Sequence, residues 1–102
     1  MNYLTLEEIK DHLSITHSNT AHDARLTRLG TAAEKWAANF LNVELTDLED
    51  SPAESPPVIA EDIKSALLFN IEMEFDRDER KMGLLQKRAE DLLWPYRQGL
   101  DT

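Results

Sequence analysis

Residues 21–41, AHDARLTRLGTAAEKWAANFL, carry the clearest structural signal in the sequence. Their apolar side chains recur every three or four residues, which places them on one face of an α-helix. That face consists of Leu26, Leu29, Ala33, Trp36, Ala37, Phe40 and Leu41. The stretch therefore predicts a long amphipathic helix, in which Gly30 indicates either close approach by another backbone or a tolerated weak point.

A shorter helix is predicted before this stretch. Thr5-Leu6-Glu7-Glu8 has the spacing of a capping box, in which the threonine and the second glutamate satisfy each other's backbone amides. Apolar residues then recur at helical spacing until Ser14. The polar residues 17–20 are predicted to form a loop before the long helix.

Two further helices are predicted after it. Pro56-Pro57 favour the start of a third helix, which keeps the helical spacing from Ile59 and runs to about Phe75. A break near Gly83 separates it from a fourth helix. That helix ends by Pro95, because proline lacks the amide hydrogen that a helix needs.

These patterns predict an all-α fold for residues 1–102, a single domain. It is a small bundle of about four amphipathic helices with an acidic, Ser/Pro-rich connecting loop. No alternating strand pattern is present, and the chain has only two valines. The expected core comprises Leu26, Leu29, Ala33, Trp36, Phe40, Ile63, Leu67 and Ile71.

Charge is the most unusual feature of the composition. The chain has 20 acidic and 11 basic residues, a net charge of −9, and residues 44–62 contain seven acids and no base. Either this segment is a solvated connector, or it repels a polyanion. No local basic patch for nucleic acid is evident from the sequence. The candidate acids are Glu44, Asp47, Glu49, Asp50 and Glu54.

Several classes of function are excluded or disfavoured. The absence of cysteine excludes disulfides, thiolate nucleophiles, zinc-thiolate sites and iron–sulfur clusters. His12, His17 and His22 are five residues apart, which does not match metal-ligand spacing on a helix. The three glycines are isolated, so no phosphate-binding loop is present. We therefore expect no enzyme, metal or cofactor, and the short apolar runs predict no membrane segment.

The order of four segments resembles the small α-helical head-tail connector, or adaptor, proteins of long-tailed bacteriophages and prophages. Two departures are Gly30, where the family usually has a large apolar residue, and residues 74–77, where it usually has an aromatic-x-Asn-Arg ending. The segments that carry the resemblance are Leu4–Ile15; Asp23, Leu26, Leu29, Ala32-Ala33, Trp36 and Phe40-Leu41; Pro57 with Ile63–Leu68; and Leu92-Leu93-Trp94-Pro95-Tyr96-Arg97.

The resemblance implies a structural role in the virion, after assembly in the cytoplasm of the bacterial host. The expected product is a ring of about twelve copies beneath the portal, which forms part of the DNA channel and a platform for the tail. Partners would be the portal, a tail-side stopper or tail-completion protein, and passing double-stranded DNA without tight binding. We expect the subunit or portal interface to include Trp94, Tyr96, Arg97 and Leu100.

Two alternatives remain open from the sequence. A free-standing acidic protein of this size is able to mimic DNA and bind a basic partner. A monomeric helical module that binds another protein is the other alternative.

Overall fold

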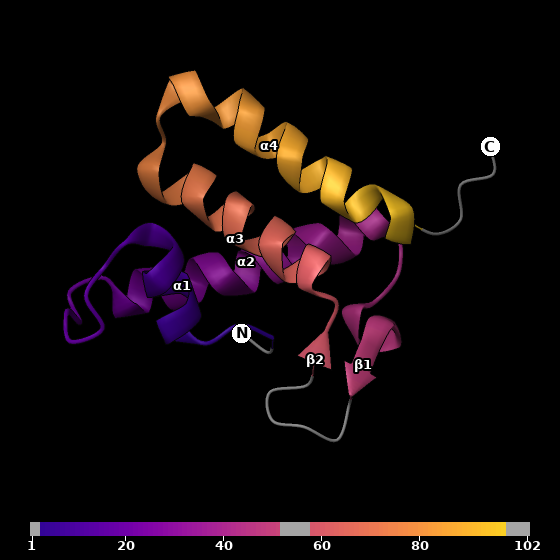
Figure 1. Ribbon diagram of the computed structural model, residues 1–102, viewed down its shortest axis with the longest axis horizontal. Helices are drawn as coiled ribbons and strands as arrows, with labels where there is room; N and C mark the ends of the chain where they lie inside the picture. The colour runs from indigo at the N-terminus through magenta and orange to yellow at the C-terminus, as the bar shows by residue number, and fades with distance from the viewer. Residues whose placement is uncertain (1–2, 52–57, 98–102) are drawn as a thin grey trace.

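The computed structural model describes residues 3–51 and 58–97, and four α-helices dominate it (Figure 1). They are α1 (Leu6–Leu13), α2 (Asp23–Leu41), α3 (Glu61–Asp76) and α4 (Glu79–Leu93). Two 3-10 turns, η1 (Leu45–Leu48) and η2 (Trp94–Tyr96), follow α2 and α4, and two short strands are β1 (Glu49–Ser51) and β2 (Val58–Ile59). The predicted all-α class of about four helices is confirmed.

Helix α3 is the centre of the packing. It forms an antiparallel hairpin with α4 and also packs against α2 and α1, so that α4 and α1 lie on opposite sides of it (Figure 1). The subunit is flat, with extents of 44 × 37 × 18 Å. Because α3 has neighbours on several sides, its buried side chains are spread widely around the helix: Ile63, Ala66, Leu67, Asn70, Ile71 and Met73.

The core agrees with the prediction at its centre and differs at its margin. Of the eight expected core residues, five are buried: Leu26, Ala33, Ile63, Leu67 and Ile71. Leu29, Trp36 and Phe40 are only half-buried against it, so their assignment to the core was wrong. The core is completed by residues outside that set, including Tyr3, Leu4, Ile9, Leu45, Ile59, Leu85 and Leu93.

Residues before α3 form a strand where a helix was predicted. Ile59 belongs to β2 and pairs antiparallel with Glu49 of β1, and α3 begins only at Glu61. Pro56-Pro57, the expected helix start, lies outside the described residues. Ile59 is buried, as expected. A single apolar residue just before a helix fits a strand as well as a first helical turn, so its spacing did not distinguish the two.

The break between α3 and α4 falls at residues 77–78, and its prediction near Gly83 was wrong. Arg77 ends α3 with φ 49°, a left-handed conformation, and its N–H donates to Met73 O at 3.1 Å. The Asp78 carboxylate then accepts from Arg80 N at 3.0 Å and caps α4. A capping aspartate thus sets the start of α4, while Gly83 is tolerated inside the helix.

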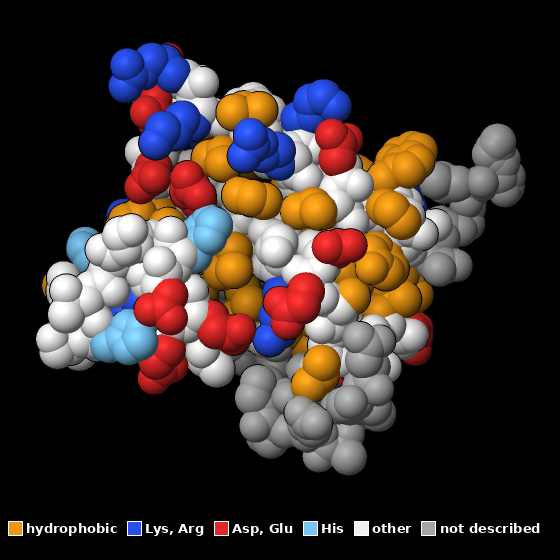
Figure 2. All heavy atoms as spheres, in the orientation of Figure 1, with side chains coloured by type: hydrophobic (Ala, Val, Ile, Leu, Met, Phe, Trp, Pro, Cys, Tyr) orange, Lys and Arg blue, Asp and Glu red, His pale blue; other side chains and the backbone are white. Residues whose placement is uncertain are grey.

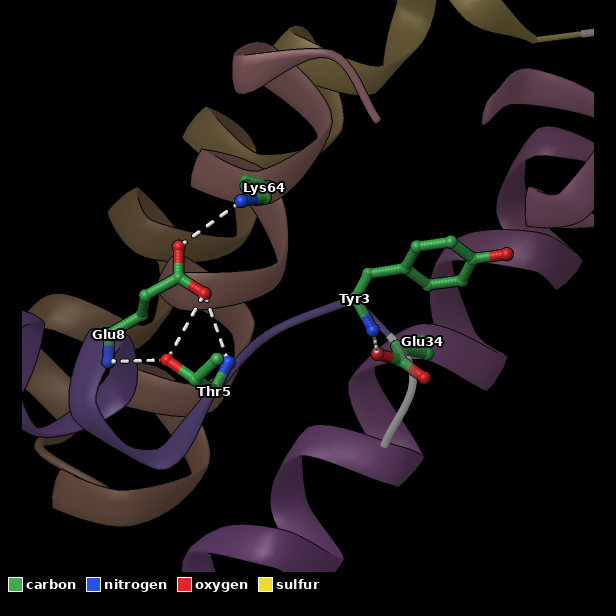
Figure 3. A network of polar contacts seen from close by, with 5 residues as sticks. All are labelled: Tyr3, Thr5, Glu8, Glu34 and Lys64. Carbon is green, nitrogen blue, oxygen red and sulfur yellow. Dashed lines mark hydrogen bonds and ion pairs between the residues drawn. The ribbon is translucent and has the colours of Figure 1, made fainter. Parts of the chain in front are cut away.

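The predicted capping box of α1 is present. Thr5 Oγ1 accepts from Glu8 N at 3.2 Å, and Glu8 Oε1 accepts from Thr5 N at 2.9 Å (Figure 3). The other oxygen of Glu8 lies 3.2 Å from Lys64 Nζ on α3. This carboxylate therefore both starts α1 and attaches its first turn to the first turn of α3.

Candidate functional site

The segment between α2 and α3 carries the acids that the sequence indicated. Glu44 and Asp47 are exposed around η1, whereas Glu49 begins β1 and is half-buried. The side chain of Asp50 and all of Glu54 lie outside the described residues. The described acids of this segment thus fall into two groups, two that face solvent and one that is part of the packed structure.

Glu49 is held by Tyr3, whose side chain is buried. The Tyr3 hydroxyl donates to Glu49 Oε2 at 2.6 Å. Figure 3 shows the second contact, in which the Tyr3 backbone N–H donates to Glu34 Oε2 at 2.8 Å. Burial raises the pKa of Tyr3 far above its ordinary value of 10.0, and the hydrogen bond and charge of Glu49 raise it further. Tyr3 therefore stays protonated and joins the start of the chain to α2 and β1.

A hollow of about 370 Å³ lies between the C-terminal half of α2 and η1. The residues that line it include two acids, Glu34 and Glu44, the base Lys35 and the apolar Leu45. The described residues around it include no histidine or cysteine. We therefore assign no reaction to this hollow.

The four predicted interface residues differ in exposure. Trp94 is 59% exposed, one of two large hydrophobic side chains that are exposed among the described residues. Tyr96 is half-buried and packs against the core, and Arg97 is also half-buried. Leu100 lies outside the described residues.

Trp94 and Arg97 form part of a terminal aromatic cluster, which we define as Trp36, Phe40, Trp94 and Arg97. Arg97 Nε donates to Phe40 O at 2.9 Å. Its guanidinium carbon lies 5.0 Å from the Phe40 ring centroid and 5.3 Å from that of Trp94. The Phe40 ring also stacks against Trp36, with centroids 6.0 Å apart. Arg97 therefore fixes the end of the described chain against α2 and holds an exposed tryptophan at the surface.

The histidines make separate structural contacts. His12 Nε2 lies 2.7 Å from Glu72 Oε1 and links α1 to α3, while His17 Nε2 lies 2.6 Å from Asp11 Oδ1. His22 packs edge-on against a phenylalanine ring of α3. Within residues 3–51 and 58–97, no three His, Asp or Glu side chains are grouped as metal ligands would be.

Four basic side chains lie together on one helix, a grouping that the sequence analysis did not point out. Figure 2 shows Lys and Arg side chains along α4, with hydrophobic side chains between them. Because an α-helix has 3.6 residues per turn, positions 80, 84, 87 and 88 share one side, a spacing that was readable in the sequence. We define the α4 outer face as Arg80, Lys81, Leu84, Lys87, Arg88 and Trp94, all exposed.

Comparison with known proteins gives one informative match. Residues 3–97 match the family described as Phage gp6-like head-tail connector protein. Neither the curated proteins nor the solved structures contain a match to this chain. None of the helices described here is long and apolar enough to cross a membrane.

Proposed function

The chain belongs to the phage gp6-like head-tail connector family, and we propose that copies of it form a ring beneath the portal through which DNA passes. Membership makes it a structural component of the virion that joins head to tail. Such a component interacts with other virion proteins, such as the portal and tail proteins. The observation that carries the proposal is the family match over nearly the whole chain, residues 3–97.

The terminal aromatic cluster supports assembly with neighbours. An exposed tryptophan held in place by an arginine loses little conformational freedom when a partner covers it. Trp94, Tyr96, Arg97 and Leu100 are therefore the proposed contacts to an adjacent subunit or to the portal. About twelve copies arranged side by side would form the ring, and a tail-side stopper or tail-completion protein would bind its other end.

The acids around η1 support passage of DNA without adhesion. Glu44 and Asp47 are exposed, and residues 44–62 contain no base that would neutralise a phosphate. A channel wall that makes few phosphate contacts releases few counterions and so binds DNA weakly. We propose that this segment approaches the channel and lets DNA slide.

The ring is tested by electron microscopy of the full chain mixed with the purified portal of the same phage. We expect a ring attached to the portal, and Trp94→Ala is expected to weaken attachment or ring formation without unfolding the subunit. Asn39→Ala, on an exposed part of α2, is the control. Failure to form rings with the portal, across a range of protein and salt concentrations, contradicts the proposal.

The role of the acids is tested on assembled rings by gel shift with duplex DNA at low salt. Glu44→Lys with Asp47→Lys is expected to make the rings retain DNA. Asp76→Lys with Glu79→Lys makes the same change in net charge at the turn between α3 and α4 and serves as the control. Equal retention by both variants shows that only net charge matters, and tight DNA binding by the unaltered subunit contradicts the channel role.

Of the alternatives, a DNA mimic requires a continuous acidic surface. The four cations of the α4 outer face interrupt that surface, which favours the connector role.

A further inference from the structure

The α4 outer face has the composition of a protein interface. The two large hydrophobic side chains exposed among the described residues, Leu84 at 54% and Trp94 at 59%, both belong to this one helix and its last turn. The inner face of α4 is already occupied, because its buried residues Leu85, Ala89 and Leu93 pack on the rest of the subunit. Nothing in the described subunit covers the outer face.

The charge of this face indicates an acidic partner. Arg80 and Arg88 lie one helical turn before and after Leu84, and Lys81 lies beside them. Lys87 Nζ lies 3.0 Å from Asp91 Oδ2, and Arg80 Nε lies 3.4 Å from Asp78 Oδ1. Arg88 and Lys81 form no ion pair with any described residue, so their charges remain available.

A protein partner fits this face better than DNA does. DNA interfaces are built from phosphate contacts and polar groups, whereas a leucine in the centre of a ring of cations needs an apolar counterpart. The net charge of −9 also opposes the approach of DNA to a single subunit. A second copy of this chain is both acidic and present at every position of the proposed ring.

The matching surface is an acidic edge, which we define as Glu7, Asp11 and Glu61. All three are exposed. The contact between Glu8 and Lys64 joins the first turns of α1 and α3, and Figure 2 shows carboxylate side chains gathered over these elements. Leu13 and Ile15 follow Asp11 in the chain, are half-buried and pack against the core.

We infer that the α4 outer face of one copy docks on the acidic edge of the next, Arg80 and Arg88 meeting Glu7 and Glu61 while Leu84 is buried between them. This inference rests on the proposed ring. The two surfaces lie on opposite sides of α3, so each copy offers one surface to each neighbour (Figure 1). A head-to-tail contact of this kind repeats until the ring closes.

The acids around η1 are a less suitable counterpart. They lie at the end of the molecule where α4 terminates, near the point at which Arg97 binds α2 (Figure 1). A head-to-tail ring needs two contact surfaces on opposite sides of the subunit. The α4 outer face and the acidic edge meet this requirement better than the α4 outer face and the η1 acids. These acids therefore serve as the comparison in the test.

The test reverses charge on one side of the contact at a time. Arg80→Glu with Arg88→Glu is expected to reduce self-association of the full chain at least about tenfold, measured by sedimentation and by ring counts on the portal. Glu7→Lys with Glu61→Lys is expected to do the same. Circular dichroism establishes that each variant folds.

Mixing the two variants gives the decisive result. In an alternating ring, each reversed α4 outer face meets a reversed acidic edge, so an equimolar mixture is expected to regain assembly that neither variant shows alone. A mixture of Arg80→Glu/Arg88→Glu with Glu44→Lys/Asp47→Lys has the same net charges. The η1 variant keeps both surfaces and is expected to form rings by itself, while Arg80→Glu/Arg88→Glu is expected to stay out of these rings. Arg28→Glu with Lys35→Glu controls for the added negative charge on α2.

Each outcome has a separate meaning. If the unaltered chain forms rings but the mixture does not recover, or if Arg80→Glu/Arg88→Glu enters rings with the η1 variant equally well, this interface is wrong while the ring stands. If the unaltered chain forms no ring on the portal, the proposed function itself fails. If Arg80→Glu/Arg88→Glu leaves assembly intact but abolishes binding of duplex DNA, the face binds DNA and the inference is overturned.

Discussion

Helices α3 and α4 are antiparallel neighbours of nearly equal length, yet they differ in what surrounds them. Over 16 residues α3 buries six side chains, whereas α4 buries three over 15 residues. Helix α3 contacts α1, α2 and α4, while the opposite side of α4 presents cations, Leu84 and Trp94 to solvent. The hairpin thus contains one helix that stabilises the subunit and one whose second face is available to partners.

The largest effect is expected from truncation inside α3. Leu67 is 0% exposed, so Leu67→Ala removes buried methyl groups and leaves a cavity, at a cost of about 2–5 kcal/mol in unfolding free energy. Urea unfolding of the full chain measures this. A loss below about 1 kcal/mol would contradict the central place of α3 in the core.

A smaller effect is expected from Tyr3, whose hydrogen bonds attach the first described residues to α2 and β1. Tyr3→Phe removes a hydrogen bond to a carboxylate and is expected to cost about 1.5–3 kcal/mol at neutral pH. Because the folded-state pKa of Tyr3 is raised above 10.0, the unfolded chain loses this proton first as pH rises, and the folded state loses stability above pH 10.

The difference in unfolding free energy between wild type and Tyr3→Phe is therefore expected to shrink above pH 10. The other titratable side chains are the same in both proteins, so the comparison isolates Tyr3. A difference that stays constant across pH 10 would show that Tyr3 ionises as it does in the unfolded chain.

On α4 a substitution is expected to stabilise. Gly83 lies inside the helix, and a Cβ placed there meets no heavy atom within 4 Å. Gly83→Ala should therefore raise the unfolding free energy by about 0.5–1 kcal/mol, by reducing the entropy lost on folding. Urea unfolding would show a loss instead if this site were packed as tightly as α3.

The smallest effect on the fold is expected at the exposed leucine of α4. Leu84→Ala makes the same chemical change as Leu67→Ala, yet should alter the unfolding free energy by no more than about 0.5 kcal/mol. Sedimentation of the same variant should show weaker self-association. A large loss of stability would place Leu84 in the subunit core and remove the contrast between the two helices.

Local signals in the sequence predicted most of the helices. The capping box at Thr5 and the apolar spacing of α2 depend on neighbours a few residues away, and both were identified correctly. The prediction failed where two local features favour different helix boundaries. A break was predicted near Gly83 because residues 76–81 contain no apolar side chain, but the carboxylate of Asp78 caps α4 five residues before Gly83.

The candidate site was less accessible from sequence. Trp94 was predicted to lie at an interface, and the structure leaves it exposed in the subunit. The α4 outer face was missed because its cations are separated in sequence by apolar and acidic residues and meet only along the helix surface. Glu49 was grouped with the exposed acids, although Tyr3, 46 residues away, holds it.

The sequence by itself determined the helical class, the acidic net charge and the absence of thiol chemistry, because composition and short-range periodicity are properties of the chain alone. Only the tertiary structure decided that Trp36 and Phe40 lie at the margin of the core and that Tyr3 is buried in it. It also decided that Ile59 belongs to a strand. The reason is that burial and strand pairing depend on which distant segment arrives to cover a residue. The sequence of an apolar helix face shows that another element will cover it. Which element does so is decided by how the helices pack around α3.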